Sequence, residues 1–247
     1  MNNYYRKYFV KSNIISLIVI FFFSFFINYY YSSFGVFPID TFFHYDSAAR
    51  ILEGQIPIRD FWIVSGFIID IIQSIFFKIL GTNWFAYIFH SSIANFLISL
   101  IIYYHFQSLK IDKITSLFFT FCFSTLAYTV SGTPFVDHHA IFFLLASTIL
   151  LMKFIYTEKN YLWFFVVLLF FLSFLTKQVP AAYIMLIQGS IIGVYILYEK
   201  NYFIIKYLIL SSFLTIFLII SLLFYLNIEL KDFYIQYIDY PRSIGST

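Results

Sequence analysis

Apolar runs of about twenty residues recur along the whole chain, and they restrict its fold more than any other feature of the sequence. Of the 247 residues, 62% are hydrophobic and 11% are charged, whereas soluble domains are about half apolar and a quarter charged. A helix needs a run of this length to cross a bilayer, and a membrane β-barrel would instead alternate apolar and polar residues in short segments. The sequence therefore predicts an all-α polytopic membrane protein.

The positions of these runs predict the helices. We expect seven membrane-spanning helices over about 14–31, 84–106, 114–131, 139–156, 161–176, 179–198 and 203–226. The first run exceeds the roughly 7–15 apolar residues of a signal peptide, so we expect it to stay attached. We find no internal repeat or linker that divides the chain. Residues 1–247 are expected to form a single membrane domain, which could be truncated after residue 226.

Residues 63–80 are apolar but carry a polar stripe. A helix of this length reaches about 27 Å, which barely spans a bilayer. Its polar residues recur at helical spacing, a pattern typical of a helix that lies at the membrane interface or packs on the protein surface. We therefore expect this helix not to span. The stripe consists of Gly66, Asp70, Gln73, Ser74 and Lys78.

The distribution of charge supports seven spanning helices. With the N-terminus inside, the cytoplasmic segments hold nine of the fifteen basic residues and only three of the twelve acidic ones, as the positive-inside rule requires. If 63–80 also spanned, the later lysine pairs would move outside. The abundant Phe, Ile, Tyr, Asn and Lys are typical of AT-rich bacterial genes. We therefore expect a bacterial inner-membrane protein whose first extracytoplasmic loop covers 35–83.

This loop contains the densest cluster of ionisable residues in the chain, between Asp40 and Gly66. We expect a short juxtamembrane helix with Asp40 as its N-cap and Gly54 at its C′ position. Asp46 and Arg50 are spaced to pair on one face of that helix. Other polar residues lie at helix ends on the same predicted side, so this side is the candidate functional site. They are Asp137, His138, His139, Lys177 and Gln178.

Five short motifs follow one another in order through the chain. Asp40, Phe43, Ala48 and Leu52 before Gly54 form the first, and the segment 56–62 with Ser65-Gly66 forms the second. The others are 76–83, Val136-Asp137 and Leu175-Thr176-Lys177. In this order they resemble the GT-C superfamily of membrane glycosyltransferases, which includes aminoarabinose transferases and protein O-mannosyltransferases. Thr41 and Phe43 differ from the acidic residue and tyrosine that are common in the family.

The resemblance implies an inverting glycosyltransferase. A sugar would move from a polyprenyl-phosphate-linked donor to a lipid, glycan or protein acceptor at a site facing the periplasm or exterior. Asp40 would be the general base, and Asp137 would orient the acceptor or hold a divalent cation together with Asp40 and His138. Lys177, with Arg59, would contact the carrier phosphate. The remaining candidate substrate-binding residues are His44, Asp46, Asp60, Trp62, His138 and Gln178.

Simpler roles are open for each of these residues. Asp40 and Asp137 could act only at helix starts, Lys177 could reach the lipid headgroups, and Trp62 could belong to the interfacial aromatic belt. At the level of function, a transporter or flippase with a polar path is the main alternative, and a truncated inactive homologue is another. The expected partners are the lipid-linked donor, its acceptor and membrane lipids, with no nucleic acid.

Overall fold

The structure, a computed structural model, describes residues 3–34, 36, 38–63, 65–128 and 132–244 and contains only helices and their connections in these residues. The predicted all-α class is confirmed. The helices are α1 (Asn3–Tyr31), α2 (Pro38–Leu52), α3 (Ile68–Leu80), α4 (Trp84–Ser108), α5 (Lys113–Leu126), α6 (Val136–Thr157), α7 (Leu162–Thr176), α8 (Gln178–Glu199), α9 (Phe203–Tyr225), α10 (Leu230–Tyr234), the π-helical segment η1 (Ile235–Asp239) and α11 (Tyr240–Ile244).

Five helices in the described part of the chain are long and apolar enough to cross a membrane, namely α1 from Ile14, α4, α6, α8 and α9. Two shorter apolar helices, α5 and α7, occupy the other predicted runs. The boundaries agree to within about three residues with two exceptions: α1 begins already at Asn3, and the run 114–131 is helical only to Leu126, with 129–131 outside the described residues. This pattern is consistent with a multi-pass membrane protein.

The helices pack into two compact units. Unit 1 consists of Met1–Phe43 and Phe76–Pro134, and unit 2 of His44–Ile75 and Phe135–Thr247. The division falls inside α2 and α3, so each of these helices contributes residues to both units. Whether the whole chain forms a single membrane domain stays a prediction.

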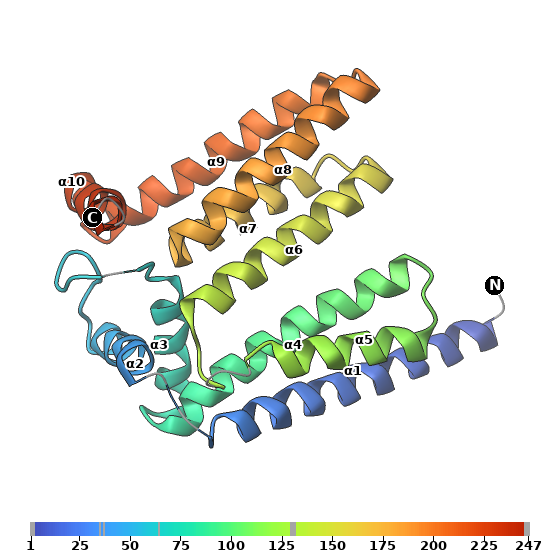
Figure 1. The fold of residues 1–247 in the computed structure, drawn as a ribbon, viewed down its shortest axis with the longest axis horizontal. Coiled ribbons are helices and arrows are strands. Elements are labelled where there is room, and N and C mark those ends of the chain that lie inside the picture. Colours follow the sequence, from blue (N-terminus) through green and yellow to red (C-terminus); the bar gives the residue numbers. More distant parts are fainter. Residues whose placement is uncertain (1–2, 35, 37, 64, 129–131, 245–247) are drawn as a thin grey trace. The chain divides into compact units, whose positions relative to one another are not determined.

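Unit 1 is built on α1, α4 and α5, which pack side by side (Figure 1). A buried polar network links the three helices. The Asn95 side-chain amide donates to Asn28 Oδ1 at 2.8 Å and to the Ser124 carbonyl at 2.9 Å. The Ser99 hydroxyl donates to Asn95 Oδ1 at 3.1 Å. Such bonds hold apolar helices together in lipid, where hydrophobic burial gives little preference for one neighbour over another.

Unit 2 contains α6, α7, α8 and α9, with α7 in contact with the other three (Figure 1). One buried apolar cluster joins the end of α6 to the start of α7 and includes Phe154 and Trp163. A second cluster lies at the other end of α7. It brings together Ile58 and Ile63 of the first loop, Leu175 of α7, and residues that follow α9, among them Tyr237.

Helix α2 ends where the sequence predicts but begins earlier. The Gly54 N–H donates to the Ile51 carbonyl, and the Gln55 N–H to the Arg50 carbonyl, each at 3.0 Å. Gly54 has φ +94°, so it is the C′ residue of a Schellman motif. The helix starts at Pro38, which places Asp40 in the first turn and corrects its expected N-cap position.

Helix α3 begins at Ile68 and ends at Leu80, shorter than the predicted 63–80. Most of its polar stripe is turned inward, since the exposed fractions of Asp70 and Gln73 are 1% and 0%, whereas Lys78 is exposed. The apolar side chains of Ile75 and Ile79 are instead exposed. The buried part of the polar face therefore packs on protein, which is one of the two expected arrangements.

Candidate functional site

Lys177 and Asp137 form an ion pair in unit 2. Lys177 is the single residue between α7 and α8, and its extended backbone ends one helix and begins the next. Asp137 lies in the first turn of α6, whose N-cap residue is Phe135. The two side chains meet with Nζ 2.7 Å from Oδ2, each about one-third exposed. The structure thus brings together a predicted cation and a predicted carboxylate.

The α7–α8 junction also holds the first loop. The Gly66 N–H donates to the Thr176 carbonyl at 3.0 Å. A Cβ atom at Gly66 would lie 1.8 Å from the Leu175 carbonyl oxygen, so only glycine fits this approach. On the other side of Lys177, the Gln178 side-chain amide donates to the Tyr237 carbonyl at 2.9 Å. Gln178, predicted to bind substrate, therefore contacts the C-terminal part of the chain.

Arg59 and Asp60 form a second pair at the tip of the loop. Arg59 donates to both Asp60 oxygens, at 2.9 and 2.8 Å, and also to the Leu226 carbonyl at 3.2 Å. The hydrogen bonds from Arg59 and from the Ile56 N–H lower the pKa of Asp60. Asp60 thus stays ionised and neutralises the charge of Arg59, which limits the part Arg59 could take in binding a phosphate.

Ile58 gives the loop its unusual backbone. It is a β-branched residue with φ +74°, a conformation that costs about 1–3 kcal/mol and persists only where the surroundings impose it. The Ile58 N–H donates to the Phe61 carbonyl at 3.0 Å, which closes a tight turn around Arg59 and Asp60. The side chain is buried in the apolar cluster below the loop.

Trp62 follows this turn and is 47% exposed. Its ring meets the Tyr240 ring edge-on, with 5.3 Å between centroids. A partly exposed tryptophan supported by a second ring offers the flat apolar surface on which a sugar can stack. The predicted role of Trp62 in sugar binding is therefore sterically open and stays a prediction.

His44 is buried and paired with Asp70. Its Nδ1 lies 2.7 Å from Asp70 Oδ1, and the exposed fractions of the two side chains are 3% and 1%. Burial raises the pKa of Asp70, although the charge and hydrogen bond of His44 oppose this shift. His44, predicted to contact the sugar, therefore joins α2 to α3 and is not presented at the surface.

The other predicted residues of unit 2 differ in exposure. Asp46 Oδ2 lies 2.7 Å from Arg50 Nε on the exposed side of α2, as the spacing of the two residues predicts. His138 is partly buried in the first turn of α6, with its ring 5.5 Å from that of Phe135. His139 is 4% exposed, and its Nδ1 lies 3.2 Å from the Phe135 carbonyl. The adjacent histidines thus have different surroundings, as expected for neighbours on a helix.

Asp40 belongs to unit 1, where it is exposed in the first turn of α2. The next residue, Thr41, is fully buried, and its carbonyl accepts a hydrogen bond from the Tyr87 hydroxyl at 2.9 Å. This bond fixes the start of α2 against α4. Asp40 therefore lies at a helix start that this bond holds in place.

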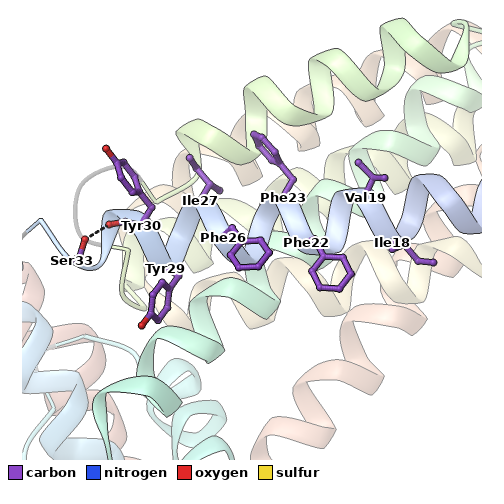
Figure 2. A pocket seen from close by; sticks show the side chains of 9 residues that line it. All are labelled: Ile18, Val19, Phe22, Phe23, Phe26, Ile27, Tyr29, Tyr30 and Ser33. Atoms are coloured by element: carbon purple, nitrogen blue, oxygen red, sulfur yellow. Dashed lines mark hydrogen bonds between the residues drawn. The ribbon is translucent and has the colours of Figure 1, made fainter.

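An open groove of about 790 Å³ runs along α1 in unit 1, and Figure 2 shows the side chains that line it. They are almost all apolar, such as Phe22 and Phe26, and the one hydrogen bond drawn joins the Ser33 hydroxyl to the Tyr30 carbonyl. None of the predicted site residues lines it. It has the character of a lipid-facing surface.

Sequence reasoning missed three residues that organise the site. Asp70 was assigned only to a polar stripe, although its spacing from Gln73 and Ser74 does mark the buried face of α3. Gln236 and Tyr237 were not identified, because their partners lie in distant parts of the chain. No local pattern in the sequence points to such contacts.

A divalent cation was one expectation for this site. In the described ranges, no three or more His, Cys, Asp or Glu side chains gather closely enough to hold a metal ion. The suggested ligands Asp40, Asp137 and His138 therefore stay a prediction, and Asp137 already contacts Lys177. Comparison with family models, with curated proteins and with solved structures finds no match to this chain.

Proposed function

We propose that this chain is a GT-C-type glycosyltransferase of a bacterial inner membrane. It would transfer a sugar from a polyprenyl-phosphate-linked donor to the hydroxyl of a lipid, glycan or protein at the outer face. The observation that supports this function best is the Lys177–Asp137 pair at the end of two apolar helices. With the proposed topology, a cation held there would lie where the phosphate of a lipid carrier meets the membrane surface.

The proposed membrane arrangement has seven spans, from the five long helices and the shorter α5 and α7. The turns at 108–113, 157–160 and 199–202 would face the cytoplasm, in keeping with their lysines. Helix α3 would stay outside the bilayer core, because its buried Asp70 and exposed Lys78 suit a juxtamembrane position. The first loop, the α7–α8 junction and the C-terminal helices would then lie on the outer side.

The proposed reaction is a single displacement at the anomeric carbon. Asp40 would accept the proton of the acceptor hydroxyl as its oxygen bonds to that carbon. The bond between the carbon and the phosphate oxygen would break on the opposite face, and its electron pair would leave with polyprenyl phosphate. Lys177 would stabilise the departing anion by a charge-assisted hydrogen bond. Asp137 holds Lys177 in place until the phosphate arrives.

Binding of the carrier is the experiment that tests this function. Purified protein in phosphatidylcholine nanodiscs should bind polyprenyl phosphate and should discriminate against uncharged polyprenol. Lys177→Gln should weaken phosphate binding about tenfold or more, the order expected for losing a hydrogen bond to a charged group. Lys78→Gln, at an exposed lysine of α3, serves as the matched control.

This function would be contradicted if the parent bound polyprenyl phosphate and polyprenol with equal affinity. Equal affinity of Lys177→Gln and Lys78→Gln for polyprenyl phosphate would contradict it as well. Carrier binding without sugar transfer in membranes supplied with lipid-linked sugars would instead favour the flippase.

A further inference from the structure

The helices that follow α9 pack onto the first loop through two neighbouring residues. Gln236 and Tyr237 are both buried, with exposed fractions of 8% and 0%. They lie in η1, a π-helical segment between α10 and α11. Such segments are rare and are found frequently at functional sites.

Gln236 completes the backbone hydrogen bonding of the loop. Its side-chain nitrogen donates to the Ile58 carbonyl at 2.8 Å, and its side-chain oxygen accepts from the Ile63 N–H at 3.3 Å. Only this orientation of the amide matches donor to acceptor at both ends. These two contacts bracket Arg59 and Trp62, and one of them holds the strained residue Ile58.

Tyr237 attaches the same segment to the helix junction that carries Lys177. Its hydroxyl donates to the Phe174 carbonyl, and its own carbonyl accepts from Gln178. Its ring packs against the rings of Phe174 and Phe233. Neighbouring residues of η1 therefore contact the loop on one side and the ends of α7 and α8 on the other.

We propose that Gln236 is a positioning residue, and that η1 holds Trp62 and Arg59 of the loop in register with the Lys177–Asp137 pair. The consequence for sugar transfer rests on the proposed function, whereas the ordering of the loop does not. Two further contacts join the same partners, from Arg59 to the Leu226 carbonyl and from Trp62 to Tyr240. Loss of the Gln236 bonds would free the loop between Ile58 and Ile63.

Hydrogen–deuterium exchange on the purified full chain in nanodiscs tests this role. Gln236→Leu replaces the amide with an apolar side chain of similar size and removes both hydrogen bonds. We expect amides in the loop 56–66 to exchange about tenfold faster, the order expected for losing a buried hydrogen bond. Gln236→Glu keeps the acceptor for the Ile63 N–H, so it should recover part of the protection. Asp239→Asn, at an exposed residue of η1, should change nothing.

Acrylamide quenching gives a second readout that needs no substrate. Trp62 is more exposed than Trp84 or Trp163, so its fluorescence should account for most of the quenching by acrylamide. Comparison with Trp62→Phe gives the contribution of Trp62. Gln236→Leu should raise this contribution, and Gln236→Glu should restore it in part. Unchanged loop exchange and quenching in Gln236→Leu would overturn the proposal. So would an equal rise in exchange over α4, because Gln236 would then support the fold and not the loop.

The kinetic readout separates this proposal from the proposed function. Where the parent transfers sugar, Gln236→Leu should lower transfer while binding polyprenyl phosphate normally, because Lys177 is untouched. Full transfer despite a mobile loop would overturn the positioning role. A parent that transfers no sugar, with exchange altered as expected, would leave the loop contact established and the glycosyltransferase function wrong.

Discussion

The Lys177 ammonium lies 2.7 Å from the carboxylate of Asp137, a residue 40 positions earlier in the chain. Each side chain is only about one-third exposed, so water contacts the pair but does not fully solvate the two charges. Asp137 neutralises the positive charge of Lys177 while no ligand is bound. An incoming phosphate would replace the carboxylate as the partner of Lys177.

Asp137→Asn should therefore strengthen carrier binding, in the opposite direction to Lys177→Gln. Removing the competing carboxylate should tighten binding of polyprenyl phosphate about fivefold, since a partly exposed pair of this kind is worth up to ~1 kcal/mol. Binding of uncharged polyprenol should not change. Affinity measured in nanodiscs of identical composition checks this. Weaker phosphate binding in Asp137→Asn would mean that the carboxylate assists the ligand and does not compete with it.

Asp70→Asn should remove a pH dependence of stability. Because burial raises the pKa of Asp70 above its ordinary value of 3.8, the folded protein holds this proton more tightly than the unfolded chain does. The stabilising contribution is thus complete below 3.8 and is lost as the pH rises through the raised value. Asn does not titrate, and its Oδ1 can still contact His44.

The Tm gained by Asp70→Asn relative to the parent should accordingly be larger at pH 7 than at pH 4. Thermal unfolding of both proteins, followed by circular dichroism in the same detergent, measures this difference. A constant difference across this range would show that Asp70 has the same pKa in the folded and unfolded protein.

Gly66→Ala should destabilise unit 2. The new Cβ would overlap the Leu175 and Thr176 carbonyl oxygens, at 1.8 and 2.4 Å, and neither backbone atom can move freely. We expect a loss of about 1–3 kcal/mol in the free energy of unfolding, the usual cost of overpacking. Gly189→Ala is the matched control, because no atom lies within 4 Å of a Cβ there. Equal stability of the two variants would contradict the close approach.

The sequence predicts the helices of this protein well and its polar contacts poorly. Runs of apolar residues are local, so the ranges of α4, α7, α8 and α9 follow from the sequence to within about two residues. The Gly54 helix end and the Asp46–Arg50 pair are also local and are confirmed.

The direction in which polar side chains face is set by tertiary packing. The stripe of α3 is a correct pattern, but whether Asp70 meets water or His44 depends on α2. The two contacts of Gln236 span more than 170 residues of sequence, and no periodicity encodes them. Within unit 2, Lys177 and Asp137, which the sequence places at helix ends on one predicted side, form an ion pair. Gln178 has a backbone partner that the sequence does not reveal.

The seven-span topology predicts the location of three turns. Reporter fusions after Lys110, Glu158 and Asn201 should all report the cytoplasm, because these turns hold the lysines that stay inside. A fusion after Gly54 should report the outer side and serves as the control. Periplasmic signals at all three turns would mean that α3 spans, and the candidate site would then be divided between the two sides of the membrane.

Sugar transfer by Asp40→Asn tests the account most directly. Asn has the size of Asp, and in the first turn of α2 it should cost at most ~1 kcal/mol through the helix dipole, so the variant should insert normally. In membranes supplied with radiolabelled polyprenyl-phosphate-linked sugars, Asp40→Asn should lower transfer by roughly 10²-fold or more, as expected for losing a positioned general base. Asp46→Asn and Asp60→Asn should cost far less. Transfer near the parent rate by a well-inserted Asp40→Asn protein would contradict the assignment of Asp40 as the base.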